Sequence, residues 1–124
     1  MKKISIIVPA YNEEEVLKIF YEETIKILNQ IKKDYDYEII FIDDGSRDNT
    51  LIEMKNLRKI DSKINIISFS RNFGKEAGMY AGLSNSSGDL VVVMDADLQH
   101  NPQIIIEMLK YIKERLWYSN NCKK

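Results

Sequence analysis

The fold is decided by one stretch of the sequence, Asp89-Leu90-Val91-Val92-Val93-Met94-Asp95-Ala96-Asp97-Leu98-Gln99-His100. Its five apolar residues, Leu90 to Met94, include three valines and are bounded by polar residues, which is typical of a strand buried on both faces. Two carboxylates, Asp95 and Asp97, follow at once, although neighbouring carboxylates repel each other and resist losing their water. The stretch therefore indicates a site for a divalent cation and phosphate at the end of a central strand, with a solvated acidic loop as the simpler alternative.

Length and composition indicate one globular domain. The chain has 124 residues, of which 44% are hydrophobic and 30% charged, enough for a single core. The net charge of −1 gives no reason to expect nucleic acid as a partner. The single cysteine, Cys122, excludes a disulfide within the chain and favours a cytoplasmic location. No segment approaches the ~18 apolar residues of a transmembrane helix, so we expect none.

Apolar runs and amphipathic segments alternate along the chain. The predicted strands cover residues 4–8, 38–42, 64–69 and 90–94, and the predicted helices run from Glu13 to about Lys33, Asp48 to Ile60, Glu76 to Ser84 and Asn101 to Leu116. Asn12 is the expected cap of the first helix, with Glu13-Glu14-Glu15 in its first turn. Pro102 is expected at the first position of the last helix. The pattern ends at Leu116, which predicts a domain over residues 1–116 and a disordered or frayed tail over 117–124.

This alternation predicts an α/β fold with a mostly parallel sheet and helices on both of its faces. Such sheets bind ligands outside the carboxyl ends of their strands, where the strand order reverses. Residues that could contact a ligand, most of them polar or charged, collect at those ends: Pro9, Tyr11, Asn12 and Glu13, then Asp43 and Asp44, then Arg71 and Lys75, then Asp95, Asp97, Gln99 and His100. The amino ends offer far fewer, which favours the cation and phosphate interpretation over the solvated loop.

A nucleotide diphosphate is the ligand that suits this pattern. The chain has no Gly-x-Gly-x-x-Gly after its first strand and no Gly-Lys-Ser/Thr loop, so a cation held by carboxylates must neutralise the phosphates. Tyr11 could stack on a base, and Asp44 or Glu13 could accept hydrogen bonds from the base or ribose. Arg71 and Lys75 either contact phosphate or are solvated, and solvation is favoured for Lys75. For His100, a surface position is favoured over a ligand role.

Four motifs resemble family 2 glycosyltransferases in their order and spacing: Ile7-Val8-Pro9-Ala10-Tyr11-Asn12-Glu13, Asp43-Asp44-Gly45-Ser46-Arg47-Asp48-Asn49-Thr50, Arg71-Asn72-Phe73-Gly74-Lys75 and Met94-Asp95-Ala96-Asp97-Leu98-Gln99-His100. The likeness is greatest to the polyprenyl-phosphate branch, which includes dolichol-phosphate mannose synthases. The resemblance implies an inverting transferase (EC 2.4 class) with a Rossmann-like GT-A fold, a UDP- or GDP-linked sugar donor, Mg²⁺ or Mn²⁺ as cofactor, and a lipid-phosphate acceptor of the cell envelope.

The resemblance also implies roles for individual residues. The nucleotide-sugar site would comprise Pro9, Tyr11, Glu13, Ile42, Asp44, Asp95, Ala96, Asp97 and Gln99. The first five would line the nucleoside pocket. The metal ligands would be Asp95, Asp97 and Gln99, with Asp95 also near the ribose. Asp97 is the catalytic candidate, because in this branch a carboxylate at that position could activate the acceptor phosphate.

Family members continue well beyond the matched region, so we expect this chain to be a truncated donor-binding part. Its alternative function is that of a non-catalytic nucleotide-sugar-binding fragment. A phospho-receiver domain is disfavoured, because it needs an acidic pair where this chain has Pro9-Ala10-Tyr11-Asn12. An exposed sheet edge and apolar surface would favour a homo-oligomer. The expected location is the cytoplasm, with peripheral attachment to the inner face of the membrane as an alternative.

Overall fold

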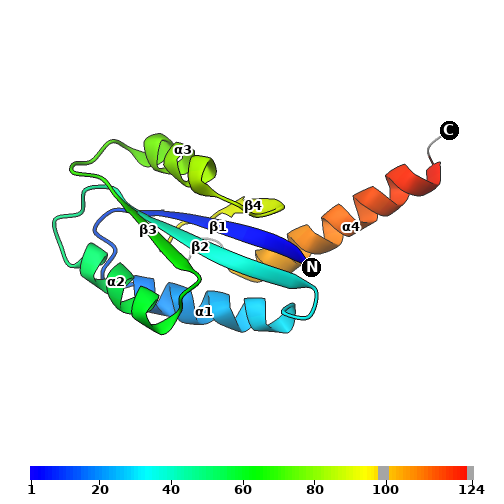
Figure 1. Cartoon of the computed structure of the whole chain (residues 1–124), viewed down its shortest axis with the longest axis horizontal. Helices are drawn as coiled ribbons and strands as arrows, with labels where there is room; N and C mark the ends of the chain where they lie inside the picture. Colours follow the sequence, from blue (N-terminus) through cyan, green and yellow to red (C-terminus); the bar gives the residue numbers. More distant parts are fainter. Residues whose placement is uncertain (98–100, 123–124) are drawn as a thin grey trace.

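The computed structural model of the protein describes residues 1–97 and 101–122, with residues 115–122 described by their backbone. Four strands and four helices alternate in the predicted order (Figure 1). The strands are β1 (Lys2–Ala10), β2 (Tyr35–Asp43), β3 (Ile64–Ser68) and β4 (Leu90–Val93). The helices are α1 (Leu17–Gln30), α2 (Thr50–Ile60), α3 (Lys75–Asn85) and α4 (Ile104–Cys122). This confirms the predicted α/β class.

All strand pairs in the described sheet are parallel, and the strand order is β3-β2-β1-β4. β1 pairs on both sides, so that Ile7 lies opposite Ile40 on one side and Val93 on the other. The chain first advances from β1 through β2 to β3, and then returns to place β4 on the opposite side of β1. The strand order therefore reverses between β1 and β4, at their shared carboxyl ends.

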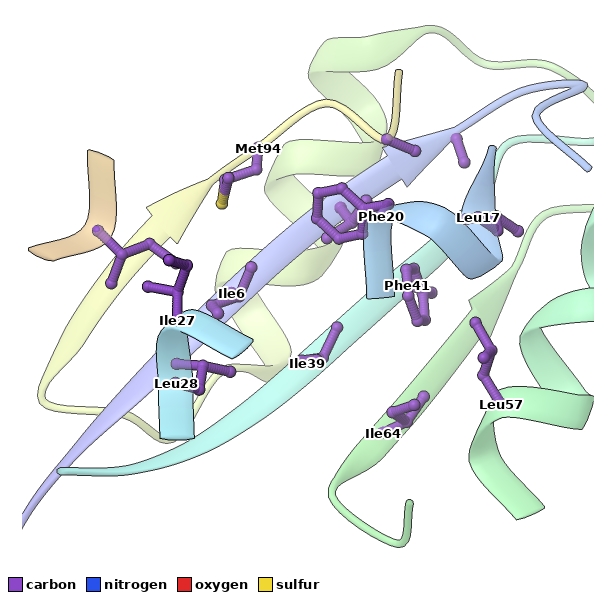
Figure 2. Close-up of a cluster of buried hydrophobic side chains, with 14 of the residues drawn as sticks. Ile6, Leu17, Phe20, Ile27, Leu28, Ile39, Phe41, Leu57, Ile64 and Met94 are labelled. Carbon is purple, nitrogen blue, oxygen red and sulfur yellow. The ribbon is translucent and has the colours of Figure 1, made fainter. Parts of the chain in front are cut away.

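Helices cover both faces of the sheet, as predicted. Figure 1 shows α3 on one face and α1 with α2 on the other. Figure 2 shows the larger core, in which Phe20 of α1 and Leu57 of α2 lie over Ile6 and Phe41 of the strands. The rings of Phe20 and Phe41 meet edge to face, with 6.3 Å between their centres. Each fully buried large apolar side chain contributes roughly 1.5–3 kcal/mol, so this face dominates the stability.

Small residues bring α3 close to the other face of the sheet. A Cβ at Gly82 would lie 2.4 Å from Cγ2 of Ile7, and one at Gly78 would lie 3.3 Å from Cβ of Pro9. The apolar residues beneath α3 form a second, smaller core around Ile7, Ile40 and Ile42. The sheet is apolar on both sides because both sides are covered.

The first helix begins later than predicted. α1 starts at Leu17 rather than Glu13, and Asn12 is not its cap. Asn12 has a positive φ of 52°; its side-chain Oδ1 accepts a hydrogen bond of 2.9 Å from the Arg47 N–H. The loop after β2 therefore uses the side chain that was predicted to cap the helix.

The last helix also differs from the prediction at both ends. α4 begins at Ile104, because Oδ1 of Asn101 accepts a 2.9 Å hydrogen bond from the Gln103 N–H and forms a turn that contains Pro102. It continues beyond Leu116 to Cys122, since the sequence there contains no glycine or proline to end it. The division into a domain over 1–116 and a tail over 117–124 stays a prediction.

β4 is not the fully buried central strand that its valines predicted. Within the described residues it pairs with β1 alone and lies at an edge of the sheet, with Val91 36% exposed. The start of α4 packs on the larger core through Ile105 and Leu109, and the rest of the helix extends away from the sheet (Figure 1). No helix in the described part of the chain is both long and apolar enough to cross a membrane.

Candidate functional site

A pocket of about 300 Å³ opens at the carboxyl ends of the strands, where the strand order reverses. It is lined by Pro9, Ala10, Tyr11, Glu13, Asp44, Asn72, Gly74, Lys75 and Asp95. These residues follow or end β1 and β2, form the connection from β3 to α3, and follow β4. Open parallel sheets bind ligands at this position, so the pocket is the candidate site.

The structure brings together five of the predicted donor-site residues on the pocket wall: Pro9, Tyr11, Glu13, Asp44 and Asp95. Ile42 is not on the wall, because its side chain is fully buried beneath Gly78 of α3. Ala96 is 1% exposed and belongs to the core. Asp97 is exposed and lies beyond the lining residues. Gln99 and His100 lie outside the described residues.

Asp44 links two walls of the pocket. The residue is 5% exposed, and its carboxylate accepts hydrogen bonds from the backbone N–H groups of Phe73 (2.8 Å) and Gly74 (3.1 Å). Its own N–H donates to the carbonyl of Ala10 at the end of β1. A carboxylate oxygen can accept more than one hydrogen bond, so these contacts leave capacity for a ligand.

Gly45 allows the connection from β3 to α3 to pass close behind Asp44. The φ of Gly45 is +70°, and a Cβ there would lie 2.3 Å from the backbone carbon of Arg71. No side chain fits this position. Beyond it, the guanidinium of Arg71 lies 4.8 Å from the centre of the Phe73 ring, which also meets Phe69 edge to face. The aromatic pair and the glycine thus fix the wall that Asn72 and Gly74 contribute.

The negative charges around the pocket act on one another. Burial raises the pKa of Glu13 above its usual value, and the charges of Asp97, Asp95 and Asp48 raise it further. The Glu13 N–H also donates to Oγ1 of Thr50, which holds the residue beside α2. Glu13, Asp95 and Asp97 therefore share one electrostatic environment, although Asp97 lies outside the pocket wall.

Lys75 is paired rather than freely solvated, which corrects the prediction. Its Nζ lies 2.6 Å from Oδ1 of Asp95, and the two side chains are 57% and 23% exposed. Lys75 is the first residue of α3, directly after Gly74, whose φ is +99°. The ion pair joins the start of α3 to the loop after β4 across the mouth of the pocket.

The residues present fit an oxygen-preferring divalent cation. Among residues 1–97 and 101–122, no three His, Cys, Asp or Glu side chains are grouped so that they hold a metal ion by themselves. Asp95 and Asp97 supply carboxylate oxygens, and Mg²⁺ or Mn²⁺ bound by one or two carboxylates completes its shell with water and substrate phosphates. The donor set therefore fits a cation that binds together with a phosphate.

Sequence reasoning missed Ala10, Asn72 and Gly74 as lining residues. The loop after the third strand contained the signal for the last two. A glycine in the loop shortly before a predicted helix indicates a turn of the chain there. This glycine alone does not predict the lining residues. The orientation of the loop toward the pocket depends on its contacts with Gly45 and Asp44.

Comparisons with known proteins agree with this geometry. CsbB of Bacillus subtilis (strain 168), whose name describes it as a glycosyltransferase, is 49% identical over 111 residues, which are 90% of this chain and 33% of CsbB. The bactoprenol glucosyl transferase of Shigella phage SfV is 42% identical over 108 residues, 87% of this chain and 34% of that protein. The chain thus spans about a third of the length of the curated relatives it matches.

A solved structure gives the same fold. Glucosyl-3-phosphoglycerate synthase from Mycobacterium tuberculosis, in complex with Mn²⁺, UDP and phosphoglyceric acid, has a TM-score of 0.59 and 28% identity, covering 84% of this chain and 36% of that one. The parallel sheet with a pocket at its order reversal is thus a Rossmann-like α/β domain of the GT-A type. The chain belongs to Glycosyl transferase family 2, which matches residues 5–116.

Proposed function

We propose that this chain forms the donor-binding part of a glycosyltransferase. That enzyme moves a sugar, with inversion, from a nucleotide-diphosphate sugar to a polyprenyl phosphate. The observation on which the proposal rests is the pocket. It is lined by Tyr11, which follows β1, by Asp44, which follows β2, and by Asp95, which follows β4. Its lining joins residues that suit a nucleoside, Tyr11 and Asp44, to a carboxylate that suits a diphosphate and its cation, Asp95.

The nucleoside would lie against β1 and β2. Tyr11 is 40% exposed at the pocket, so its ring is available to stack on a base. Pro9 adds apolar wall, while Glu13 and Asp44 accept hydrogen bonds from the base or ribose. Ile42 supports this region from beneath α3 and does not itself touch the nucleoside through its side chain.

The diphosphate would lie toward the loop after β4. Asp95 and Asp97 would hold the cation, and Gln99 is proposed as a further ligand. Between the two aspartates lies Ala96, which is buried. When bound, Mg²⁺ or Mn²⁺ neutralises charge on the leaving diphosphate. Asp97 is exposed, and its proposed role is that of a base which would activate an acceptor phosphate approaching from solvent. An ionised phosphate needs little help from a base.

The acceptor proposal is supported by a relative. The phage protein that is 42% identical is named a bactoprenol glucosyl transferase, and bactoprenol is a polyprenyl lipid. A lipid acceptor fits a location in the cytoplasm or at the inner face of the membrane, in synthesis of the cell envelope. UDP and GDP sugars are both candidate donors.

The proposal is tested by thermal unfolding of the 124-residue chain with UDP or GDP, each with and without Mn²⁺. A nucleotide that binds the folded state raises the melting temperature, and the rise grows with the logarithm of its concentration once that concentration exceeds Kd. We expect a rise with one nucleotide that requires Mn²⁺ and is lost in Asp95→Asn. Absence of any shift at millimolar nucleotide and Mn²⁺ would contradict the proposal.

A second candidate function is that of a non-catalytic nucleotide-sugar-binding fragment, which the one-third coverage of the relatives favours for this chain in isolation. Transfer of a labelled sugar to a polyprenyl phosphate separates the two. Product formation by the 124-residue chain would establish catalysis, whereas metal-dependent nucleotide binding without product would leave the binding function.

We also propose that the isolated chain forms homo-oligomers through the edge of β4. Val91 on this strand and Met108 on α4 are both partly exposed beside an apolar groove of about 210 Å³. A free strand edge beside apolar surface favours pairing with a second copy. Analytical sedimentation should show a dimer or larger species, and a monomer at all concentrations would contradict this.

A further inference from the structure

The proposed donor site contains a cation of its own, the ammonium of Lys75. Among the described residues that line the pocket, Lys75 is the single basic side chain, while Glu13, Asp44 and Asp95 are acidic. Its Nζ lies 2.6 Å from Oδ1 of Asp95. This is the carboxylate that the proposed function assigns to the metal, so the ammonium and the metal compete for the charge of the same side chain.

We propose that Lys75 is a phosphate-binding residue that exchanges partners, from Asp95 in the ligand-free chain to the donor diphosphate in the loaded one. The inference rests on the proposed function, because it requires a diphosphate and its cation in this pocket. Lys75 neutralises Asp95 when the pocket holds no ligand. It releases Asp95 when a divalent cation binds, and the phosphate that accompanies the cation becomes its new partner.

The geometry keeps Lys75 near the diphosphate after this exchange. Lys75 Nζ lies 2.6 Å from Asp95 Oδ1, so a divalent cation held by this carboxylate would repel the ammonium and weaken the ion pair. A phosphate that accompanies this cation would be an anion within reach of the ammonium that the cation displaces. The side chain is 57% exposed, so it can change rotamer without disturbing the core.

The backbone around Lys75 is held in place on both sides. The N–H of Gly74, the preceding residue, donates to Asp44, and the Gly78 N–H donates back to the carbonyl of Gly74 as α3 begins. The first N–H groups of a helix have no acceptor within it and favour an anion nearby. Lys75 therefore projects from a fixed helix start whose own polarity also suits a phosphate.

Loss of the Lys75 ammonium should change the affinities for Mn²⁺ and for nucleotide in opposite directions, whereas a general loss of folding would lower both. Removal of the ammonium should strengthen binding of Mn²⁺ alone, because Asp95 loses its competitor. The same removal should weaken binding of nucleotide in the presence of Mn²⁺, because the diphosphate loses a partner. Replacement by arginine keeps the charge and should preserve nucleotide binding.

The test measures the affinities of wild type, Lys75→Gln and Lys75→Arg for Mn²⁺ alone and for UDP or GDP at saturating Mn²⁺, by titration calorimetry. Lys63→Gln is the matched control, because Lys63 also forms an ion pair with an aspartate, Asp36, but at the opposite edge of the sheet. We expect Lys75→Gln to bind Mn²⁺ about two- to fivefold more tightly. We expect it to bind the nucleotide at least about tenfold more weakly, with Lys75→Arg and Lys63→Gln close to wild type.

Loss of either half of this pattern overturns the inference. Equal nucleotide affinity in Lys75→Gln and wild type would show that Lys75 does not touch the diphosphate. A parallel decrease in both affinities would show that Lys75 only supports the fold. A wild-type chain that binds neither nucleotide would contradict the proposed function and this inference together, whereas the first two results contradict the inference alone.

Discussion

Asp44, at the end of β2, accepts a 2.8 Å hydrogen bond from the backbone N–H of Phe73 in the connection between β3 and α3. The same carboxylate accepts a second hydrogen bond from the Gly74 N–H. The pocket wall near Lys75 is therefore held by a residue that directly follows a different strand, β2. An acidic residue that was predicted to contact the nucleoside also positions the opposite side of the site.

Asp44→Asn tests this positioning role. The variant keeps the shape of the side chain, but one oxygen becomes an NH₂ group that cannot accept from a backbone N–H. We expect a loss of about 1.5–3 kcal/mol in the free energy of unfolding, together with weaker nucleotide binding. Urea unfolding measures the first effect, and Asp34→Asn, an exposed aspartate just before β2, is the control. An Asp44→Asn variant as stable as the control would show that these hydrogen bonds do not hold the loop.

Gly45→Ala and Gly74→Ala form a matched pair of backbone substitutions. Both glycines have a positive φ, which strains an alanine by roughly 1–3 kcal/mol. Only at Gly45 would the new Cβ also meet backbone, 2.3 Å from the carbon of Arg71, whereas nothing lies within 4 Å at Gly74. We expect Gly45→Ala to be the less stable variant in thermal unfolding. The reverse order would show that the loop moves aside at little cost.

The sequence predicted those parts of the fold that depend on local pattern. The apolar runs located all four strands, and the polar residues after them located the pocket, including Tyr11 and Asp44. Contacts between distant segments were not predictable in this way. The Lys75–Asp95 pair depends on β4 returning beside β1, and the edge position of β4 depends on which strands pair, neither of which is encoded by periodicity.

Local competition explains the remaining differences. Asn12 has the chemistry of a helix cap, but its side-chain oxygen accepts a hydrogen bond from the Arg47 N–H instead of from a helix N–H. The helix α1 begins at Leu17. Ile42 is two residues before the pocket residue Asp44 in the sequence, yet α3 covers its side chain. In both cases the chemistry of the side chain was predicted, but a contact with another segment of the chain determines its role.

Thr24→Val should stabilise the protein. Thr24 is fully buried in α1, and within the described structure its hydroxyl oxygen has no hydrogen-bond partner. Valine has the same shape without the unpaired polar group, so we expect a gain of about 1 kcal/mol in the free energy of unfolding. The contrasting variant is Thr50→Val, because the Thr50 hydroxyl accepts a hydrogen bond from the Glu13 N–H and donates one to Oδ1 of Asp48. We expect Thr50→Val to destabilise, and equal effects of the two variants would contradict this account.

Glu38 should make the stability depend on pH. This 6% exposed residue of β2 accepts hydrogen bonds from Oγ of Ser5 (2.5 Å) and the Ser87 N–H (2.7 Å), and Lys3 lies 3.7 Å away. Burial acts to raise the pKa of Glu38, but the hydrogen bonds from Ser5 and Ser87 with the charge of Lys3 outweigh it and lower the pKa below its usual 4.5. The network anchors the chain just before β4, and therefore the strand that leads to Asp95.

Since the pKa of Glu38 is lower in the folded state than in the unfolded state, its stabilising contribution is present above the unfolded value and is lost as the pH falls through the folded one. We expect Glu38→Gln to lower the free energy of unfolding by about 1.5–3 kcal/mol at neutral pH, and this deficit to shrink as the pH is lowered to about 3. Denaturant unfolding across this pH range measures the difference from wild type. Glu23→Gln, which removes an exposed ion pair with Lys26, should cost less than about 1 kcal/mol throughout. A deficit in Glu38→Gln that stays constant with pH would mean that the charge of Glu38 does not stabilise the fold.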